Sequence, residues 1–241
     1  MISNIIYRLS CFADYAQLTY NKKDLIRILD EFDEEKIEPT LFPEVHPNGE
    51  VSQRMQFTIQ SKDKVITIII AGDRIDVQVD SREKNGFNSE LRPEIKKDML
   101  LYMQKILELF RDCTALPYRL AWFTSYIYFE VSNEEKVRFR NKFLYELDFF
   151  KTNRLDDMIA RYAAMREITI KGDKERINVV TTISRFFNNA GSDREVDGFR
   201  IDYDINTWQG NRRSRFDDKS IEVFAISALE IQNALNGNIL S

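Results

Sequence analysis

The amino-acid sequence predicts an α+β fold: an internal duplication of a β-α-β-β-β-α unit, with antiparallel-rich sheets and helices packed on one face. Three observations lead to this prediction: a segment that occurs twice, strands in which apolar and polar residues alternate, and helices in which apolar residues recur every three or four positions. Only 8 glycines and 5 prolines occur in 241 residues, so long regular elements are expected to dominate.

The duplication rests on a nine-residue segment. Residues 7–15 (YRLSCFADY) recur 111 positions later as residues 118–126 (YRLAWFTSY), and five of the nine residues are identical. Shorter matches follow in the same order: 58–60 with 169–171, and 74–77 with 200–203 after a polar insertion at 188–198. We therefore divide the chain into a first unit, residues 1–114, and a second unit, residues 115–241, which can pack as one continuous domain.

The first unit shows all six elements. In order they are a strand at 5–12, a helix after residue 21, strands at 54–60, 64–71 and 74–80, and a helix at about 90–110. Asn21 suits the N-cap of the first helix, and Pro93 suits the first turn of the second. The stretch from Pro39 to Ser52 has no counterpart in the repeat, and it is either a partner-binding flap or a connection across the sheet.

The second unit repeats this order. Its elements are a strand at 118–131, a helix at about 133–150, strands at 165–171, 176–186 and 199–207, and a C-terminal helix. Asp217 or Asp218 is expected to cap that last helix and Gly237 to end it. Residues 153–164 fit either a helix or the beginning of a strand. Alternation along the strands predicts one apolar face covered by the helices and one polar face.

The composition excludes several classes of protein. The 35 basic and 39 acidic residues give a net charge of −4, which argues against a dominant nucleic-acid or anionic-membrane binder. One histidine, His46, excludes two-histidine zinc motifs, and the glycines do not have the spacing of a phosphate-binding loop. Cys11 and Cys113 are too far apart in sequence for a C-x-x-C pair. We expect a soluble, cytoplasmic protein without a cofactor, since no signal peptide or long apolar run is evident.

The repeated segment places Arg8 and Arg119 at equivalent positions. Two arginines beside a symmetric groove can bind a carboxylate or phosphate in bidentate fashion. The simpler interpretation is that each arginine pairs with an acidic neighbour for structural reasons, with Asp76 and Asp202 as the expected partners.

Carboxylates on the late strands suggest a second kind of site. Because side chains alternate along a strand, Asp76 shares a face with Asp80, and Asp202 shares a face with Asp204. Oxygen ligands in this arrangement can hold a hard cation such as magnesium. Solvent-facing strand residues show the same pattern, so no metal ligand is assigned.

The segment from residue 208 to 216 is the strongest local argument for nucleic acid. It contains Trp208, Arg212, Arg213 and Arg215, and such residues contact phosphates and stack on bases. The first unit has no equivalent cluster. An exposed loop that binds a protein or only contacts solvent fits the same residues.

The late strand GFRIDYDIN (198–206), Phe216 and the terminal NGNI (236–239) resemble a sporadically distributed bacterial protein family of unknown function. The resemblance covers mainly about the last 60 residues. It implies a patchily inherited bacterial gene, in keeping with a role in defence or a mobile element, and it provides no catalytic residues to carry over.

Together these patterns favour a non-enzymatic binding or assembly protein that engages a protein partner or a second copy of itself, as an oligomer. Two other functions stay open. One is nucleic-acid binding across a duplicated saddle. The other is a metal-dependent hydrolase that uses Asp76, Asp202 or Asp204. No residue is assigned a catalytic role.

Overall fold

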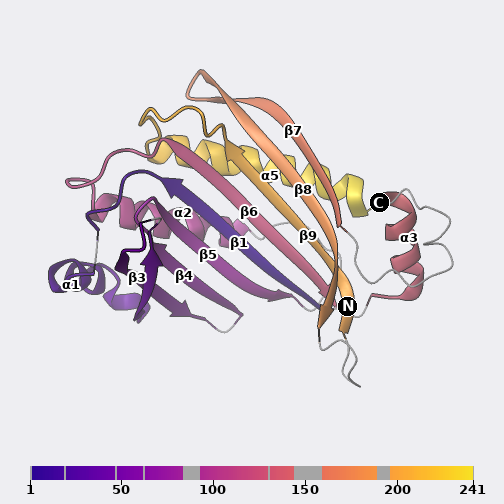
Figure 1. Cartoon of the computed structure of the whole chain (residues 1–241), viewed down its shortest axis with the longest axis horizontal. Coiled ribbons are helices and arrows are strands. Elements are labelled where there is room, and N and C mark those ends of the chain that lie inside the picture. Colours follow the sequence, from indigo (N-terminus) through magenta and orange to yellow (C-terminus); the bar gives the residue numbers. More distant parts are fainter. Residues whose placement is uncertain are drawn as a thin grey trace.

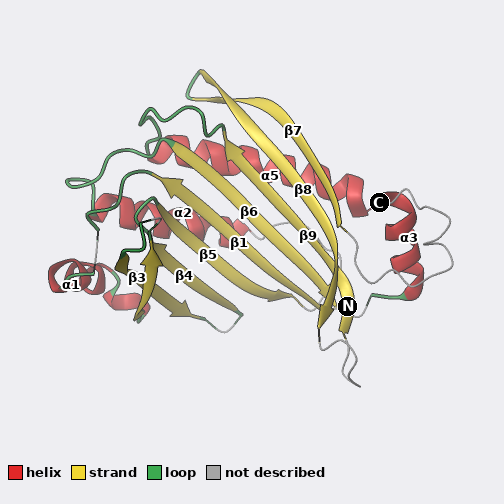
Figure 2. Cartoon of the chain, viewed as in Figure 1, coloured by secondary structure: helices red, strands yellow, loops and turns green. Residues whose placement is uncertain are grey.

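The strands of the computed structural model form one large antiparallel sheet. The structure describes residues 2–18, 20–46, 48–61, 63–83, 93–129, 131–143, 159–188 and 196–240. The strands are β1 (Ile2–Phe12), β2 (Glu38–Val45), β3 (Val51–Gln60), β4 (Lys64–Ile70), β5 (Arg74–Glu83), β6 (Arg119–Phe129), β7 (Ile159–Ile170), β8 (Asp173–Asn188) and β9 (Val196–Thr207). The helices are α1 (Lys22–Glu31), α2 (Pro93–Leu109), α3 (Asn133–Phe143) and α5 (Asp218–Leu240) (Figures 1 and 2). The predicted α+β class is confirmed.

The strand order places the two units side by side in this sheet. The order is β2-β3-β4-β5-β1-β6-β9-β8-β7. At its centre β1 pairs antiparallel with β6, with Tyr7 opposite Thr124. Moving outward, β5, β4 and β3 follow on one side and β9, β8 and β7 on the other. Strand β2 is added outside β3, so the first unit contributes one strand more than the second.

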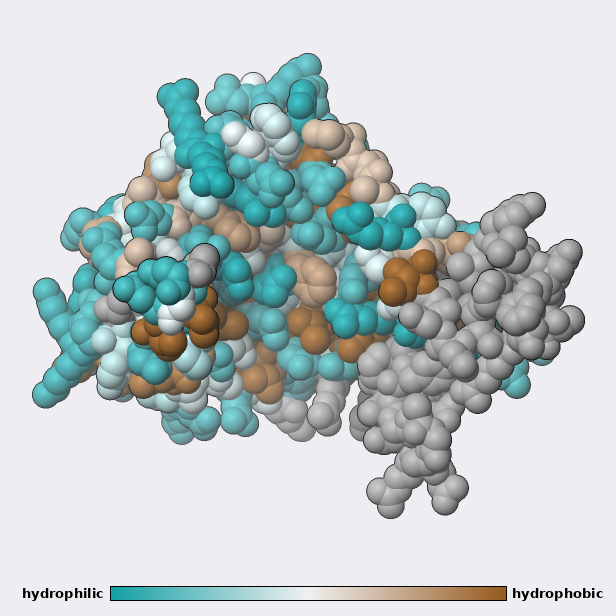
Figure 3. Space-filling view, viewed as in Figure 1, coloured by the Kyte–Doolittle hydropathy of each residue, from teal (hydrophilic) through white to brown (hydrophobic). Residues whose placement is uncertain are grey.

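One face of the sheet is covered by helices and the other is open. In Figure 1 the long helices α2 and α5 lie behind the sheet, and the face toward the viewer carries no described helix. On β1, Tyr7, Leu9 and Cys11 are buried on the helix-covered face, while Arg8 between them points to the open face. Hydrophilic residues dominate the viewed surface in Figure 3, interrupted by apolar patches. The predicted division into an apolar and a polar face is confirmed.

The two long helices contact the sheet through different chemistry. Between α2 and β5, buried apolar side chains include Val77 and Val79 of the strand and Met103 of the helix. Beneath α5, buried polar groups form a hydrogen-bonded network around Gln232. The Gln232 Oε1 atom accepts from Trp122 Nε1 at 3.0 Å and from Thr124 Oγ1 at 2.7 Å. Its amide nitrogen donates to the Tyr126 hydroxyl at 2.7 Å.

A buried arginine joins β2 and β3 to the neighbouring loop. Arg54 is 1% exposed, and its Nε donates to Glu44 Oε2 at 2.6 Å. Its Nη1 donates to the backbone carbonyls of Ala16 and Leu18 at 3.1 and 3.3 Å. Burial raises the pKa of Glu44, but hydrogen bonds from Arg54 and from the Gly72 N–H outweigh it and hold this pKa below its usual value.

Several predicted helix boundaries are confirmed. Asn21 is the N-cap of α1, and its side chain accepts a hydrogen bond from the Asp24 N–H at 2.9 Å. Pro93 is the first residue of α2. Asp217 caps α5, because its Oδ1 accepts from the Ser220 N–H at 3.0 Å. Residues 144–150 of the predicted third helix lie outside the described residues.

The predicted end of the last helix is wrong. Helix α5 continues through Gly237 to Leu240. The glycines with positive φ are Gly49 and Gly172, so Gly237 does not form a left-handed cap. Buried residues on both sides, Asn236 at 1% and Ile239 at 7% exposure, hold this last turn against the sheet.

Two open questions from the sequence are answered. The stretch from Pro39 to Ser52 is not a flap, because it forms most of β2 and the turn into β3. Residues 159–164 belong to strand β7, and 153–158 lie outside the described residues. No helix in the described ranges has the length and apolar character that crossing a membrane requires.

Candidate functional site

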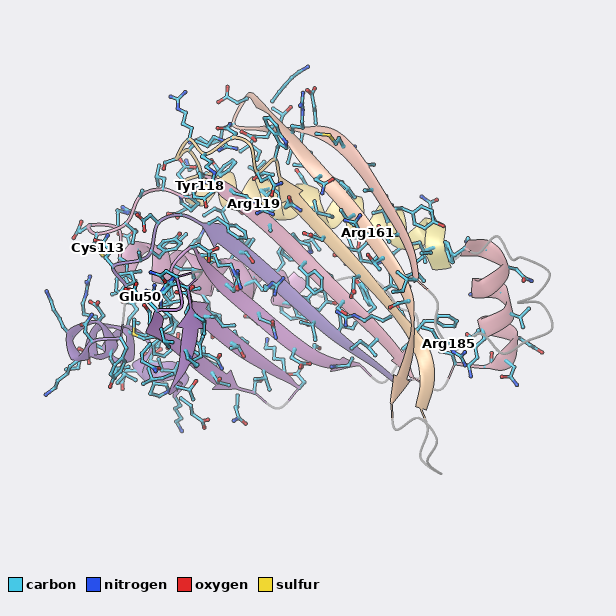
Figure 4. All side chains as sticks on the ribbon, in the orientation of Figure 1. Glu50, Cys113, Tyr118, Arg119, Arg161 and Arg185 are labelled. Atoms are coloured by element: carbon cyan, nitrogen blue, oxygen red, sulfur yellow. The ribbon has the colours of Figure 1, made fainter. Side chains whose placement is uncertain are left out.

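A line of arginines and aromatic rings crosses the open face near one end of the central strands. Its members, which we call the arginine–aromatic row, are Arg74 on β5, Phe12 on β1, Arg119 on β6, Trp208 directly after β9, and Arg176 on β8. Phe12 lies opposite Arg74 on one side and Arg119 on the other. Asn206 pairs with Ala121, so continuing this register places Trp208 beside Arg119, which is labelled in Figure 4.

Cations and rings stack in this row. The Arg119 guanidinium carbon lies 4.6 Å from the centre of the Phe12 ring. The Arg176 guanidinium carbon lies 5.4 Å from the Trp208 ring, and the Trp208 N–H donates to the Arg176 carbonyl at 2.9 Å. Stacking fixes the plane of a guanidinium group while leaving its N–H edge able to donate hydrogen bonds.

Each arginine of the repeated segment stacks on the phenylalanine of the other copy of the segment. Arg8 lies opposite Phe123, with its guanidinium carbon 4.9 Å from that ring, while Arg119 lies opposite Phe12. Phe12 and Phe123 are themselves equivalent in the nine-residue repeat. The antiparallel pairing of β1 with β6 therefore brings the arginine of each segment onto the phenylalanine of the other. The two arginines are four residues apart in this register, about 13 Å along the strands.

Unpaired buried polar atoms cluster on the same face. The Nε atoms of Arg8 and Arg119, Asp76 Oδ1 and Ser125 Oγ are buried without a hydrogen-bond partner in the described part of the chain. All four side chains lie on the open face of three neighbouring strands, β5, β1 and β6. Buried polar atoms are costly when unpaired, so this face carries unpaired groups that the helix-covered core would not tolerate.

The two aspartates that sequence suggested as partners of these arginines are paired elsewhere. Arg74 Nε donates to Asp76 Oδ2 at 2.9 Å, and Arg200 Nε donates to Asp202 Oδ1 at 2.8 Å. Each pair joins residues i and i+2 on one strand. Arg119 instead donates from Nη2 to Asn206 Oδ1 at 3.3 Å.

The carboxylates of the two late strands do not converge. Strands β5 and β9 are separated by β1 and β6, and Asp202 is offset from Asp76 by four residues along the strands, so the two carboxylates are about 20 Å apart. Asp204 lies on β9 with Asp202, opposite Phe123. Among the described residues, no three His, Cys, Asp or Glu side chains are grouped as a metal site requires.

The arginines predicted as one cluster in the loop after β9 have different surroundings. Arg215 is a structural anchor: its Nε donates to Glu175 Oε1 at 2.6 Å, and its Nη1 bonds to backbone carbonyls including that of Arg213 at 2.9 Å. Arg212 and Arg213 have exposed side chains. Trp208 is 46% exposed, and Gly210 lies so close that a Cβ there would be 2.7 Å from the indole ring.

Two cavities lined by described residues contain no member of the arginine–aromatic row. One, of about 490 Å³, lies beside α1 and the β2 edge and is lined by Tyr20, Leu25, Pro39, Thr40, Leu41, Met55 and Phe57. Another, of about 170 Å³, is lined by residues from the end of α2 and the start of α5, including Leu107, Pro117 and Phe216. Neither combines convergent polar groups with a nucleophile.

The remaining reactive side chains are held by structural contacts. His46 Nε2 lies 2.8 Å from Ser52 Oγ within the turn between β2 and β3. Cys11 is fully buried, and burial raises the pKa of its thiol, so the thiolate is disfavoured. Cys113 is a separate free thiol whose Sγ donates to the Phe110 carbonyl at 3.3 Å.

Comparison with known proteins gives no family assignment. The chain matches no protein-family model, and no curated protein sequence is significantly similar to it. The resemblance to a bacterial family of unknown function therefore stays a prediction.

Sequence reasoning found Arg119 and Trp208 but missed Phe12, Arg74 and Arg176 as members of the same row. These residues are far apart in the chain. The available signal was the pair of Arg-x-x-x-Phe segments, which becomes meaningful once β1 and β6 are known to be neighbours.

Proposed function

We propose that this protein is a non-enzymatic binding module that engages a protein partner across the open face of its sheet. The observation that carries the proposal is the arginine–aromatic row, in which the Arg119 guanidinium is fixed 4.6 Å from the centre of the Phe12 ring. An exposed indole, Trp208, adds apolar contact area beside it. Tryptophan and arginine are the residues that most often dominate binding energy at protein interfaces.

The chemistry of the row favours an acidic, extended segment of the partner. Three arginines, Arg74, Arg119 and Arg176, alternate with two rings, and oriented guanidinium groups bind carboxylates in bidentate fashion. The row crosses strands from β5 to β8, so a partner lying across the strands can contact several arginines. Rim arginines such as Arg212 and Arg213 add favourable long-range charge.

A nucleic-acid strand fits this face less well. Asp80, Asp202 and Asp204 lie on the same open face but beyond the row along the strands, so they repel a phosphate backbone that extends past the row. A short acidic segment lying across the strands on the row does not meet them. Binding of an oligonucleotide is therefore treated as an outcome that contradicts the proposal.

Titration of labelled peptides tests this function. The probes are a peptide of alternating Glu and Phe, its Lys-and-Phe counterpart, and a single-stranded oligonucleotide, measured by fluorescence anisotropy at two salt concentrations. We expect the acidic peptide to bind, and Arg119→Gln or Trp208→Ala to weaken binding at least about ten-fold.

Arg200→Gln provides the matched control, since Arg200 is a half-exposed arginine on the same face at the other end of β9. It should leave affinity for the acidic peptide unchanged. The proposal is contradicted if Arg119→Gln and Trp208→Ala bind the acidic peptide as tightly as the wild type does. Preferential binding of the oligonucleotide contradicts it as well.

We also infer that the fold arose by internal duplication. Three observations support this origin: the matching strand order on both sides of β1 and β6, the reciprocal arginine–phenylalanine stacking, and the i, i+2 pairs Arg74–Asp76 and Arg200–Asp202. The registers of the two units differ, however. Asp76 lies opposite Ser10, whereas Asp202 lies opposite Ser125, which corresponds to a shift of four residues. An even shift keeps every side chain on its own face, so the apolar pattern survives it.

A further inference from the structure

The outer edge of β7 is the second surface with the properties of a binding site. Among the described residues, β8 is the strand that pairs with β7, along all twelve of its residues. Most of β7 is exposed on both faces, including Ile159 at 64%, Tyr162 at 52% and Met165 at 58%. The strand contains no proline or glycine, so every one of its residues has the backbone N–H that pairing with another strand needs.

The geometry of antiparallel pairing restricts how β7 can pair with a second copy of itself. Opposite residues alternate between hydrogen-bonded and non-hydrogen-bonded pairs. A two-fold axis between the two strands maps the pair on one side of it onto the pair on the other side, so these two pairs are of the same type. Because the types alternate along the strands, the axis must pass through the middle of a pair formed by one residue and its own copy. An axis between two residues would require neighbouring pairs of the same type. Only registers centred on a residue are therefore possible.

One such register gives complementary contacts throughout. When Ala164 lies opposite its own copy, Arg161 lies opposite Glu167 of the other chain, and this ion pair occurs twice. On the same face, Ala163 lies opposite Met165, and on the other face Tyr162 lies opposite Arg166, a pairing that allows cation–π stacking.

The neighbouring registers lose this complementarity. Centring on Ala163 places Arg161 opposite Met165, and centring on Met165 places Arg161 opposite Thr169. Glu167 already lies 3.6 Å from Lys174 within the chain, but both side chains are largely exposed, and such a pair contributes little. Glu167 is therefore able to accept Arg161 from a second copy.

We propose that two copies of this protein pair antiparallel through β7, centred on Ala164, and form one sheet that runs through both chains. A two-fold axis perpendicular to the sheet keeps the helix-covered faces on the same side. The open faces then also join, so the arginine–aromatic rows of both copies face the same direction. Arg161 on β7, seen in Figure 4, is the residue that selects the register.

Cysteine cross-linking tests the register. In a Cys113→Ser background, Ala164→Cys places two thiols directly opposite each other, with Cβ atoms about 5 Å apart. We expect a short bifunctional thiol reagent to convert this variant to covalent dimers much faster than Ala163→Cys, whose thiol lies opposite Met165. Equal cross-linking of the two variants, or a maximum at another position of β7, overturns the proposal.

Charge exchange tests the ion pair. Arg161→Glu or Glu167→Arg alone should raise the dimer dissociation constant at least about ten-fold, measured by analytical ultracentrifugation, because both symmetric pairs become repulsive. The double variant should restore dimerisation. A wild-type chain that stays monomeric at its highest soluble concentration, or a double variant no better than either single variant, overturns the proposal. Arg119→Gln should leave the dimer intact, so failure of peptide binding and failure of dimerisation are distinguishable.

Discussion

The two edges of the sheet differ in almost every property that controls strand addition. Strand β2 has eight residues, two of them prolines, and Glu44 near its end is held by the buried Arg54. Strand β7 has twelve residues and no proline, and most of its side chains are exposed on both faces. Proline removes backbone donors from an edge, and a short edge offers few hydrogen bonds. The same sheet therefore ends in one closed edge and one edge able to accept a strand.

The difference follows from one additional strand. Counting outward from β1 and β6, β3 and β7 occupy the same position. Strand β3 is covered by β2 on its outer side and buries Met55, Phe57 and Ile59 on its helix-covered face. Strand β7 has no described counterpart of β2, and Ile170 and Ala160 are its buried apolar residues. An added edge strand thus changes an equivalent position from interior to surface.

The largest expected effect on the free energy of unfolding comes from removing the buried arginine that holds the β2 edge. Arg54→Ala should lower the free energy of unfolding by about 3 to 5 kcal/mol, because Glu44 and two carbonyls lose a buried charged partner. Urea denaturation measures this change. Arg111→Ala, which removes an exposed pair with Glu108, is the control and should cost less than about 0.5 kcal/mol. Similar losses in both variants would show that Arg54 does not hold the edge.

The helix interfaces of the two units provide the next comparison. Gln232→Leu should cost about 1 to 3 kcal/mol, since the buried Trp122 and Thr124 lose their shared acceptor beneath α5. Met103→Leu, on the face of α2 that packs on the sheet, conserves volume in an apolar interface and should cost less than about 1.5 kcal/mol. Thermal and urea melts of both variants measure the difference, and a Gln232→Leu protein as stable as wild type would contradict the role of the network.

The cap of α5 gives a smaller and pH-dependent effect. Hydrogen bonds from Lys171 and Ser220 hold the pKa of Asp217 well below its ordinary value of 3.8. The unfolded chain therefore binds this proton at higher pH than the folded chain, and the stabilisation is complete above about pH 5 and is lost as the pH falls. Asp217→Ala should cost about 1 kcal/mol at pH 7. The gap between variant and wild type should close in acid, and a gap independent of pH would contradict this cause.

The smallest expected change in stability comes from a variant that tests why β2 does not pair with a further strand. Replacing Pro39 and Pro43 with threonine should change the free energy of unfolding by no more than about 1 kcal/mol, because both residues are exposed on an edge strand. The restored N–H groups should nevertheless increase self-association, which light scattering measures against concentration. Unchanged association would mean that the hydrogen bond between Arg54 and Glu44, and not the prolines, keeps this edge from pairing.

Much of the architecture was predictable because it depends on local periodicity. Alternation predicted β1, β3, β4, β5 and β9, and helical spacing predicted α1, α2 and α5, with Asn21 and Asp217 at their caps. Strand β2 was missed because most of its side chains are exposed and its two prolines are typical of loops. The sequence predicts a helix end at Gly237, but packing of Asn236 and Ile239 outweighs the propensity of a single glycine.

The sequence by itself determined which residues face the helices, where most helices begin, and that two segments with the same Arg-x-x-x-Phe pattern exist. Only the tertiary structure decided that β1 and β6 are neighbours, which brings Arg8 onto Phe123 and Arg119 onto Phe12. It also decided that β7 lies at an edge while β3 does not. The physical reason is that side-chain periodicity is a property of each strand alone, whereas strand order results from hydrogen bonds and burial between segments distant in the chain.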